Sequence, residues 1–177
     1  SEWPVEHVVK ALCFYHPDDD AEMKAHQEDV IKRLFAAARR NKLEFLLEVI
    51  PSKVAASDEA TSAKIIQRFY DLGVYPDWWK LEPLKSDAAW GKAVDAIERN
   101  DPYTRGIVVL GLDAPEAELA ASFKLAAQHQ LVKGFAVGRT IFSKSAEAWL
   151  KGEMSDADAV AQMAANYQRL CDIWDKA

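Results

Sequence analysis

A lysine and a glutamate stand two residues apart in the apolar run YPDWWKLEP, residues 75–83, which has a proline near each end. In an extended strand Trp78, Lys80 and Glu82 share one face. Burying an ionised group without a partner is costly, so a buried lysine in a strand suggests a functional role. An amine removed from water holds its proton less strongly, and the neutral amine can attack a carbonyl group to form a Schiff base. We therefore predict that Lys80 is a nucleophile; the alternative is a lysine that reaches the strand end and pairs with a carboxylate.

Two more charged residues occupy comparable places in the preceding apolar runs. Lys10 lies within HVVKALCFY at 7–15, and Glu48 lies near the end of LEFLLEVI at 43–50. A carboxylate at the end of a strand can act as a general acid/base, and Lys10 on the adjacent strand could supply its counter-charge. Glu82 could equally be the partner of Lys80, so the pairing among these residues stays open at this stage.

The motif GFAVGRTIF at 134–142 indicates a second kind of chemistry, because it ends an apolar run and turns toward a helix. Gly138 allows close backbone approach, and Arg139 can bind a phosphate through two parallel hydrogen bonds. The loop GLDAP at 111–115, with Gly111 and Asp113, follows the preceding apolar run, so both halves of a phosphate site between neighbouring loops are present. We predict a phosphate site here; the alternative is a tight turn with a surface arginine.

The remaining candidate residues give weaker evidence for a functional role. His16 directly follows the first apolar run and could contact a substrate, although a single histidine is more often structural. The other histidines do not cluster with acids or cysteines at metal-ligand spacing. The run DDD at 18–20 is most simply the solvated start of a helix, with a divalent cation as the alternative. We predict no metal site and no cofactor.

The composition limits the class of protein. Half of the 177 residues are hydrophobic and the net charge is −6, without a basic stripe, so we expect a globular chain that does not bind nucleic acid. No apolar run is long enough to cross a bilayer, and we expect neither membrane binding nor a signal peptide. Cys13 and Cys171 lie far apart in apolar surroundings, which predicts buried, reduced thiols in a cytoplasmic protein.

Short apolar runs alternate with longer amphipathic ones along the whole chain. The short runs are nearly continuous rather than alternating, which is typical of strands covered on both faces. Polar residues that suit helix starts precede the amphipathic segments: 18–20, Ser57 or Asp58, Ser86 or Asp87, and Ser155. The predicted strands are 7–15, 43–50, 77–82, 106–112 and 131–137, and the predicted helices are 20–41, 58–72, 86–100, 115–129, a short one near 144–150, and 155–175.

This order amounts to five consecutive βα units, an α/β fold with a parallel sheet in a single domain spanning 1–177. Two architectures compete, an open doubly wound sheet and part of a (β/α)8 barrel. The sequence has no glycine-rich phosphate motif after the first predicted strand, which weighs against the doubly wound sheet. The second agrees with charged residues on three successive strands, since barrel enzymes keep their chemistry at strand ends. A closed barrel needs about 250 residues and eight strands, so we expect a fragment of a longer chain or completion by association.

Four motifs together, HVVKALCFYHPDD, WWKLEP, GLDAPEAEL and GFAVGRTIF, resemble a known group. They are similar to the C-terminal aldolase-like domain fused to the 5-dehydro-2-deoxygluconokinase of bacterial myo-inositol catabolism, which is related to class I aldolases of the tagatose-1,6-bisphosphate aldolase type. The resemblance implies strands 4 to 8 of a (β/α)8 barrel. It implies metal-independent cleavage of 2-deoxy-5-keto-gluconate 6-phosphate to dihydroxyacetone phosphate and malonate semialdehyde.

The resemblance also implies residue roles. Lys80 matches the Schiff-base lysine on the sixth strand, Lys10 a lysine on the fourth, and Glu48 a glutamate that ends the fifth. Gly138 and Arg139 match a glycine-arginine pair that binds phosphate after the last strand. The implied partners are the phosphorylated sugar acid, the absent N-terminal half of the barrel and a sugar kinase domain, or a second copy. The alternative function is a non-catalytic module that binds a phosphosugar or regulates the kinase.

Overall fold

The protein is built around a five-stranded sheet in which all strands are parallel and follow one another in sequence order, β1-β2-β3-β4-β5. The computed structural model describes residues 3–111 and 115–177. Each predicted strand is present within a few residues of its expected bounds. The strands are β1 Val8–Cys13, β2 Glu44–Val49, β3 Trp78–Leu81, β4 Gly106–Leu110 and β5 Val132–Ala136.

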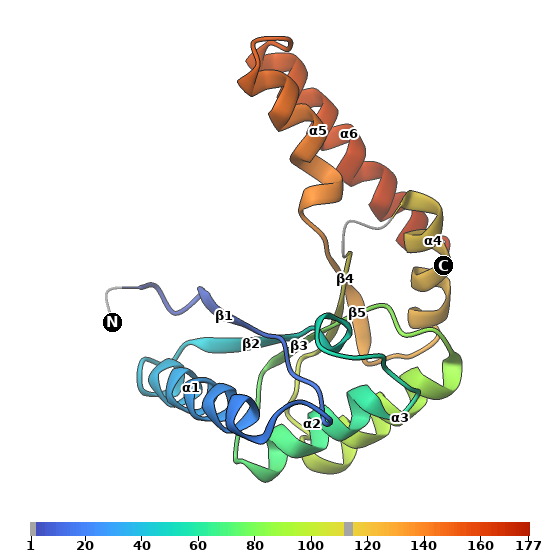
Figure 1. The fold of residues 1–177 in the computed structure, drawn as a ribbon. Coiled ribbons are helices and arrows are strands. Elements are labelled where there is room, and N and C mark those ends of the chain that lie inside the picture. The colour runs from blue at the N-terminus through green and yellow to red at the C-terminus, as the bar shows by residue number, and fades with distance from the viewer. Residues whose placement is uncertain (1–2, 112–114) are drawn as a thin grey trace.

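Helices follow the strands in regular alternation (Figure 1). The predicted α/β organisation with five βα units is therefore confirmed. The helices are α1 Ala21–Arg40, α2 Thr61–Asp71, α3 Asp87–Asn100, α4 Glu116–Ala126, α5 Arg139–Leu150 and α6 Asp156–Trp174, with a short 3-10 helix, η1 Pro51–Lys53, after β2.

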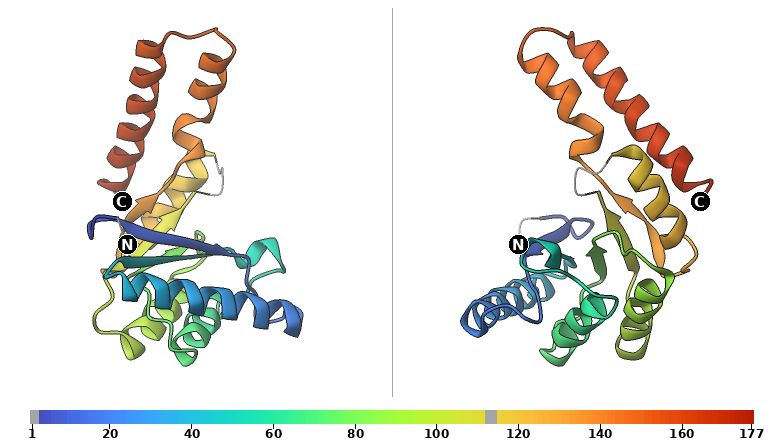
Figure 2. Two further views of the ribbon diagram at one scale, coloured as in Figure 1. Left: turned by 90° about the vertical axis from the view of Figure 1, so that its left-hand side faces the viewer. Right: turned by 45° about the vertical axis from the view of Figure 1, so that its right-hand side comes forward.

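The sheet is singly wound. Helices α1 to α3 lie side by side against one face, and α4 continues the same layer beside β4 and β5 (Figures 1 and 2). A doubly wound sheet would reverse its strand order and place helices on both faces. The sequential order and the one-sided helices therefore exclude the doubly wound alternative.

Side chains alternate strictly across the central strands. In β2, Phe45, Leu47 and Val49 point into the helical layer and are buried. Trp79 and Leu81 do the same from β3. Full burial of such a side chain contributes about 1.5–3 kcal/mol, so this face fixes the register. The intervening residues, which include Glu48 and Lys80, are thereby placed on the opposite face.

The cap predicted at Ser86 or Asp87 is confirmed at Ser86, and Asp20 and Ser155, predicted only as residues at helix starts, are also caps. Asp20, Ser86 and Ser155 accept hydrogen bonds from backbone N–H groups in the first turns of α1, α3 and α6. The cap predicted at Ser57 or Asp58 is wrong, because α2 begins at Thr61. Asp58 instead accepts hydrogen bonds from the Ala60 N–H and the Thr61 hydroxyl, forming a turn just before the helix.

The expectation that the strands are covered on both faces is wrong for β1. Val8, Leu12 and Phe14 are 41%, 44% and 46% exposed on the face opposite the helices. β1 is also an edge strand, so one side of its backbone has no neighbouring strand in the sheet. The face opposite the helices is therefore open to solvent at this edge.

Helix α5 is longer than the short helix predicted near 144–150, because it begins directly after Gly138. It packs against α6 in an antiparallel hairpin that projects away from the sheet (Figures 1 and 2). Among the described residues, no helix combines the length and apolar character needed to cross a bilayer.

Candidate functional site

Three charged side chains meet on the open face of the sheet. Glu48 of β2 lies beside Lys80 of β3 in the strand register, and the Lys80 Nζ is 3.2 Å from Glu48 Oε1. Lys10 of β1 lies two residues before the residue opposite Glu48, and its Nζ reaches Glu48 Oε2 at 2.5 Å. The structure therefore answers the question that the sequence left open, since Glu48 is the carboxylate that pairs with both lysines.

The three side chains differ in exposure. The side chains of Glu48 and Lys80 are 7% and 17% exposed, whereas that of Lys10 is 47% exposed. Glu48 Oε2 is buried and has no hydrogen bond within the described residues, so its contact with Lys10 is an ion pair without hydrogen-bond alignment. A buried carboxylate oxygen in this state can accept a hydrogen bond from a ligand without first losing one.

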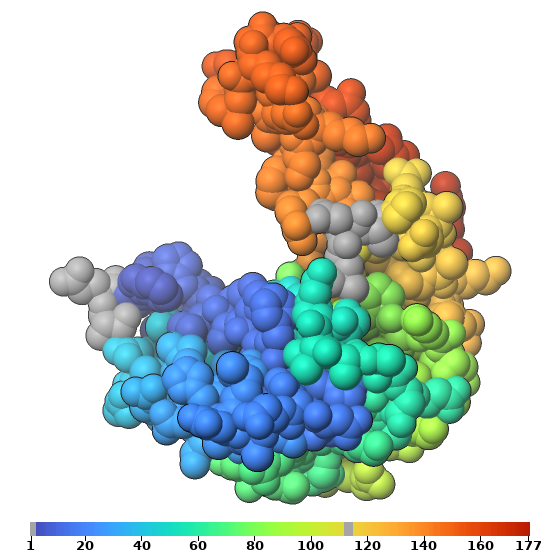
Figure 3. All heavy atoms as spheres, in the orientation of Figure 1, coloured from blue at the N-terminus to red at the C-terminus, as the bar shows by residue number. Residues whose placement is uncertain are grey.

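These side chains line a cavity of about 370 Å³ between β1, η1 and the start of α5. Figure 3 shows the surface hollowed between the N-terminal strand, in blue, and the hairpin, in orange. The lining brings together Lys10, Glu48, Lys80, Gly111, Gly138 and Arg139, six of the residues predicted from the sequence. The volume lies in the range of small-molecule sites.

The phosphate side of this cavity is formed by the start of α5. Gly138 is the N-cap and makes no side-chain capping bond, while Arg139 and Thr140 begin the helix and line the cavity. Thr140 Oγ1 is buried and has no hydrogen bond in the described residues. Backbone N–H groups at a helix start favour anions, so this end of the cavity has the donors that an anionic group requires.

Gly111 has a packing role at this end. A Cβ placed on Gly111 would lie 2.9 Å from Val137 Cγ1, closer than side chains pack. Glycine therefore lets the ends of β4 and β5 approach each other beside the cavity. Asp113, predicted as a further ligand from the same loop, lies outside the described residues.

Glu82 is not part of this cavity, although the strand alternation predicted that it shares a face with Lys80. β3 ends at Leu81, and Pro83 follows, so the alternation does not extend to Glu82. The buried Glu82 carboxylate accepts hydrogen bonds from the backbone N–H and the hydroxyl of Ser52. Glu82 therefore holds η1 in place rather than pairing with Lys80.

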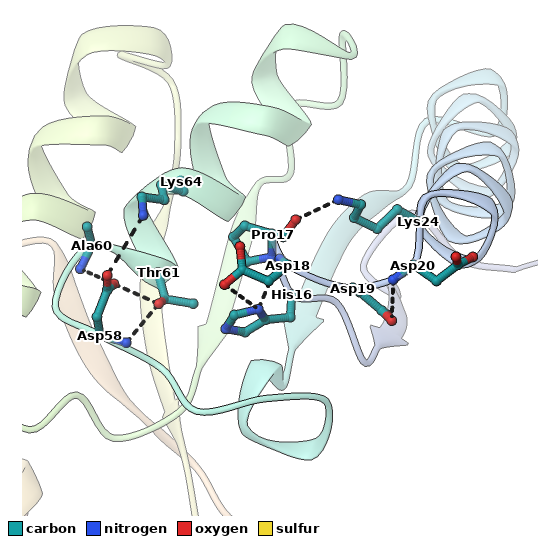
Figure 4. Close-up of polar contacts among 10 residues, drawn as sticks. All are labelled: His16, Pro17, Asp18, Asp19, Asp20, Lys24, Asp58, Ala60, Thr61 and Lys64. Atoms are coloured by element: carbon teal, nitrogen blue, oxygen red, sulfur yellow. Dashed lines mark hydrogen bonds and ion pairs between the residues drawn. The ribbon is translucent and has the colours of Figure 1, made fainter.

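His16 also lies apart from the cavity. It is 2% exposed in the segment between β1 and α1, and its Nδ1 accepts a hydrogen bond from the Asp18 N–H (Figure 4). In the close-up the contacts of His16 go to Asp18, and the turn of Asp58, Ala60 and Thr61 forms a separate group of contacts. The structure does not bring His16 to the three charged side chains, and its contacts are those of a structural residue.

Two polar lining residues were missed from the sequence. Lys53 ends η1, and Thr140 follows Arg139 in α5. For Thr140 the available signal was its place in the glycine-arginine motif. For Lys53 the available signal was its position just after the strand that carries Glu48, because loops that follow strands often carry binding residues.

Cys13 is excluded as a nucleophile by its surroundings. Burial, and to a smaller extent the charge of Glu48, raises the pKa of the Cys13 thiol to about 12, so it stays protonated at neutral pH. Its Sγ contacts the Glu48 carbonyl oxygen at 3.8 Å. Both cysteines are free, and Cys171 is only partly buried, which corrects the prediction that both are buried.

Two other hollows lack the grouping of Lys10, Glu48 and Lys80. One, about 680 Å³, lies between the segments that follow β2 and β3 and contains Glu82. Another, of about 380 Å³, lies between α1 and α2, where Arg68 and Tyr15 already hydrogen-bond Glu28. In the ranges 3–111 and 115–177, no cluster of three or more His, Cys, Asp or Glu is arranged to hold a metal ion.

Comparison with protein-family models gives a match over the whole chain. A family model described as "Uncharacterized protein conserved in bacteria (DUF2090)" matches residues 1–177. No curated protein matches the sequence.

Proposed function

The chain belongs to the DUF2090 family, and from that premise we propose that it is the C-terminal part of a (β/α)8-barrel class I aldolase that cleaves a phosphorylated keto sugar acid. One observation carries the proposal. Lys80, a mostly buried lysine, lies 3.2 Å from a buried carboxylate inside a cavity that also holds Arg139. The sequence resemblance supplies the candidate substrate, 2-deoxy-5-keto-gluconate 6-phosphate.

The chemistry starts at Lys80. Its neutral amine attacks the ketone carbon at C5, and loss of water from the carbinolamine gives an iminium ion. A base removes the proton of the C3 hydroxyl, and the C3–C4 bond breaks with its electron pair moving into the iminium. Malonate semialdehyde leaves, the resulting enamine takes up a proton, and water releases dihydroxyacetone phosphate. Lys80 is regenerated, so no cofactor is consumed.

Glu48 is placed to move the protons of these steps. Its Oε1 faces Lys80 and can accept a proton from the amine as the carbonyl is attacked. Its buried Oε2 has no hydrogen-bond partner in the described residues and can receive a substrate hydroxyl. Lys10 contributes positive charge beside Oε2.

The start of α5 is proposed to bind the phosphate. Arg139 supplies a charged fork, and Thr140 Oγ1 is a buried hydroxyl without a hydrogen-bond partner in the described residues. Glycine at 138 leaves no side chain at the N-cap itself, where a Cβ would lie 3.2 Å from the Phe142 ring.

The open face of the sheet supports the proposed barrel. Sequential parallel strands with helices on one side are the arrangement of a barrel wall. Val8, Leu12 and Phe14 leave apolar surface uncovered on the inner side. We propose that the remaining barrel half, with its sugar kinase domain, or a second copy covers this surface.

A second function has support from the same ion pairs. In the structure Lys80 is paired with the Glu48 carboxylate, so the cluster also suits a non-catalytic phosphosugar-binding module that regulates a kinase. Such a module binds its ligand after Lys80→Ala and depends on Arg139. An aldolase loses turnover with Lys80→Ala.

The experiment that separates the two is a cleavage assay. The complete gene product is incubated with 2-deoxy-5-keto-gluconate 6-phosphate, and dihydroxyacetone phosphate is followed by NADH oxidation with glycerol-3-phosphate dehydrogenase. We expect turnover that Lys80→Met reduces to background and that Arg139→Met slows mainly through a higher KM. Binding without product release, or unchanged turnover in Lys80→Met, contradicts the aldolase and favours the binding module.

A further inference from the structure

One cation of the cavity has no part in the proposed chemistry. Lys53 lines the cavity from η1, and in the described part of the chain it forms no ion pair. Lys10 and Lys80 are both engaged by Glu48, and Arg139 lies at the start of α5. The described lining therefore has four cationic side chains and one carboxylate, which is more positive charge than a single phosphate requires.

The segment that carries Lys53 is held firmly. Pro51 is buried, and the N–H of Val54 donates a hydrogen bond to the Pro51 carbonyl at 2.9 Å. Ser52 donates two hydrogen bonds to the Glu82 carboxylate, which is itself 8% exposed. A buried carboxylate that bonds both the backbone and the side chain of one residue fixes that turn. The backbone that presents Lys53 is therefore fixed before a ligand arrives.

Lys53 and Arg139 line the cavity from segments that follow different strands. Lys53 follows β2 and Arg139 follows β5, three strand positions along the sheet. At a strand spacing of about 4.8 Å this separation is about 14 Å on a flat sheet and less across a curved one. A ligand with one anionic group at each end of a six-carbon chain can engage both cations, whereas a ligand with a single anionic group cannot.

We propose that Lys53 binds the carboxylate of the substrate, and that Glu82 acts as a positioning residue that holds Lys53 through Ser52. This inference deepens the proposed function and rests on it for the identity of the substrate. It makes Lys53 the residue that selects a sugar acid phosphate over a sugar phosphate that lacks the acid group.

A matched pair of non-reacting ligands tests this selection. 6-Phosphogluconate and sorbitol 6-phosphate differ in having a carboxylate or a hydroxymethyl group at C1, and neither has a ketone for Lys80 to attack. Isothermal titration with the complete gene product gives the ratio of their dissociation constants. We expect the wild type to favour the acid by about tenfold, the size of one charge-assisted contact.

Single substitutions show which residues cause the difference between the two dissociation constants. Lys53→Met should bring the ratio close to one by weakening only the acid, and Glu82→Gln should reduce it about threefold while sorbitol 6-phosphate binds as before. Arg139→Met should weaken both ligands alike. Lys85→Met is the charge-matched control, because Lys85 lines the separate 680 Å³ hollow, and it should leave the ratio unchanged. Circular dichroism verifies that each variant is folded.

The proposal is overturned if wild type binds both ligands equally or binds neither, or if a folded Lys53→Met keeps the tenfold ratio. The result is independent of the aldolase chemistry. A tenfold ratio that depends on Lys53, found together with no turnover, would reject the aldolase while supporting this carboxylate site.

Discussion

Glu48 should be coupled more strongly to Lys80 than to Lys10, although Lys10 is the nearer lysine. The Nζ to carboxylate distances are 2.5 Å for Lys10 and 3.2 Å for Lys80, but the lysine side chains are 47% and 17% exposed. Exposed pairs contribute about 0.2–1 kcal/mol, and breaking a buried pair costs about 3–5 kcal/mol. The Lys80–Glu48 pair is closer to a buried pair than the Lys10–Glu48 pair is. We therefore expect a coupling free energy of about 2 kcal/mol between Glu48 and Lys80 and about 0.5 kcal/mol between Glu48 and Lys10.

Two double-mutant cycles measure these couplings. Urea unfolding is recorded for Glu48→Gln, Lys80→Met, Lys10→Met and the two double variants that contain Glu48→Gln. Raising the salt concentration to 0.5 M should remove most of the Lys10 coupling and leave most of the Lys80 coupling, because salt screens exposed charges more strongly. A Lys10 coupling equal to or larger than that of Lys80 would refute the claim that burial, rather than distance, decides the strength of these contacts.

Three further predictions concern the scaffold. Because burial raises the pKa of Cys13 to about 12, iodoacetamide at pH 8 should alkylate Cys171 well before Cys13, as measured by peptide mass; equal rates in folded protein would contradict this. Arg68 hydrogen-bonds Glu28 and lowers the pKa of that carboxyl below its unfolded value of about 4.3. The ionised Glu28 carboxylate therefore stabilises the fold above about pH 4.3, and this stabilisation is lost as the pH falls through the folded pKa. The difference in urea midpoint between wild type and Glu28→Gln should therefore shrink from pH 7 to pH 3, and a constant difference would show that ionisation of Glu28 does not stabilise the fold. Trp79→Ala, which empties a fully buried site, should cost about 3–5 kcal/mol, whereas the 90% exposed Tyr103→Ala should stay within about 0.5 kcal/mol; similar losses in urea unfolding would contradict the assigned core.

The fold and the charged cluster were predictable because both depend on short-range periodicity. Strands of a parallel sheet bring residues near their ends to one edge, so Lys10, Glu48 and Lys80 could be grouped without coordinates. The choice of partner was not predictable. Glu82 and Glu48 are equally plausible from spacing, and only the end of β3 at Leu81 removes Glu82 from the shared face.

The positions of Lys53 and His16 could not be predicted, because they depend on contacts between segments distant in sequence. Lys53 reaches the cavity because Glu82, 30 residues beyond Ser52, holds the turn before it. His16 is buried in the segment after β1, where the neighbouring Tyr15 packs against Phe69 of α2. Neither contact leaves a periodic signal, since both involve irregular segments whose backbone is set by tertiary packing.

The most direct test of the central claim is the position of a trapped adduct. The complete gene product is incubated with dihydroxyacetone phosphate and sodium borohydride, digested, and mapped by tandem mass spectrometry, with Lys80→Met and Lys10→Met as matched samples. A Schiff-base aldolase gives a reduced adduct on Lys80 that is retained in Lys10→Met and absent from Lys80→Met. An unmodified Lys80 in the wild type, or an adduct confined to Lys10 or Lys53, would contradict the assignment of Lys80 as the nucleophile.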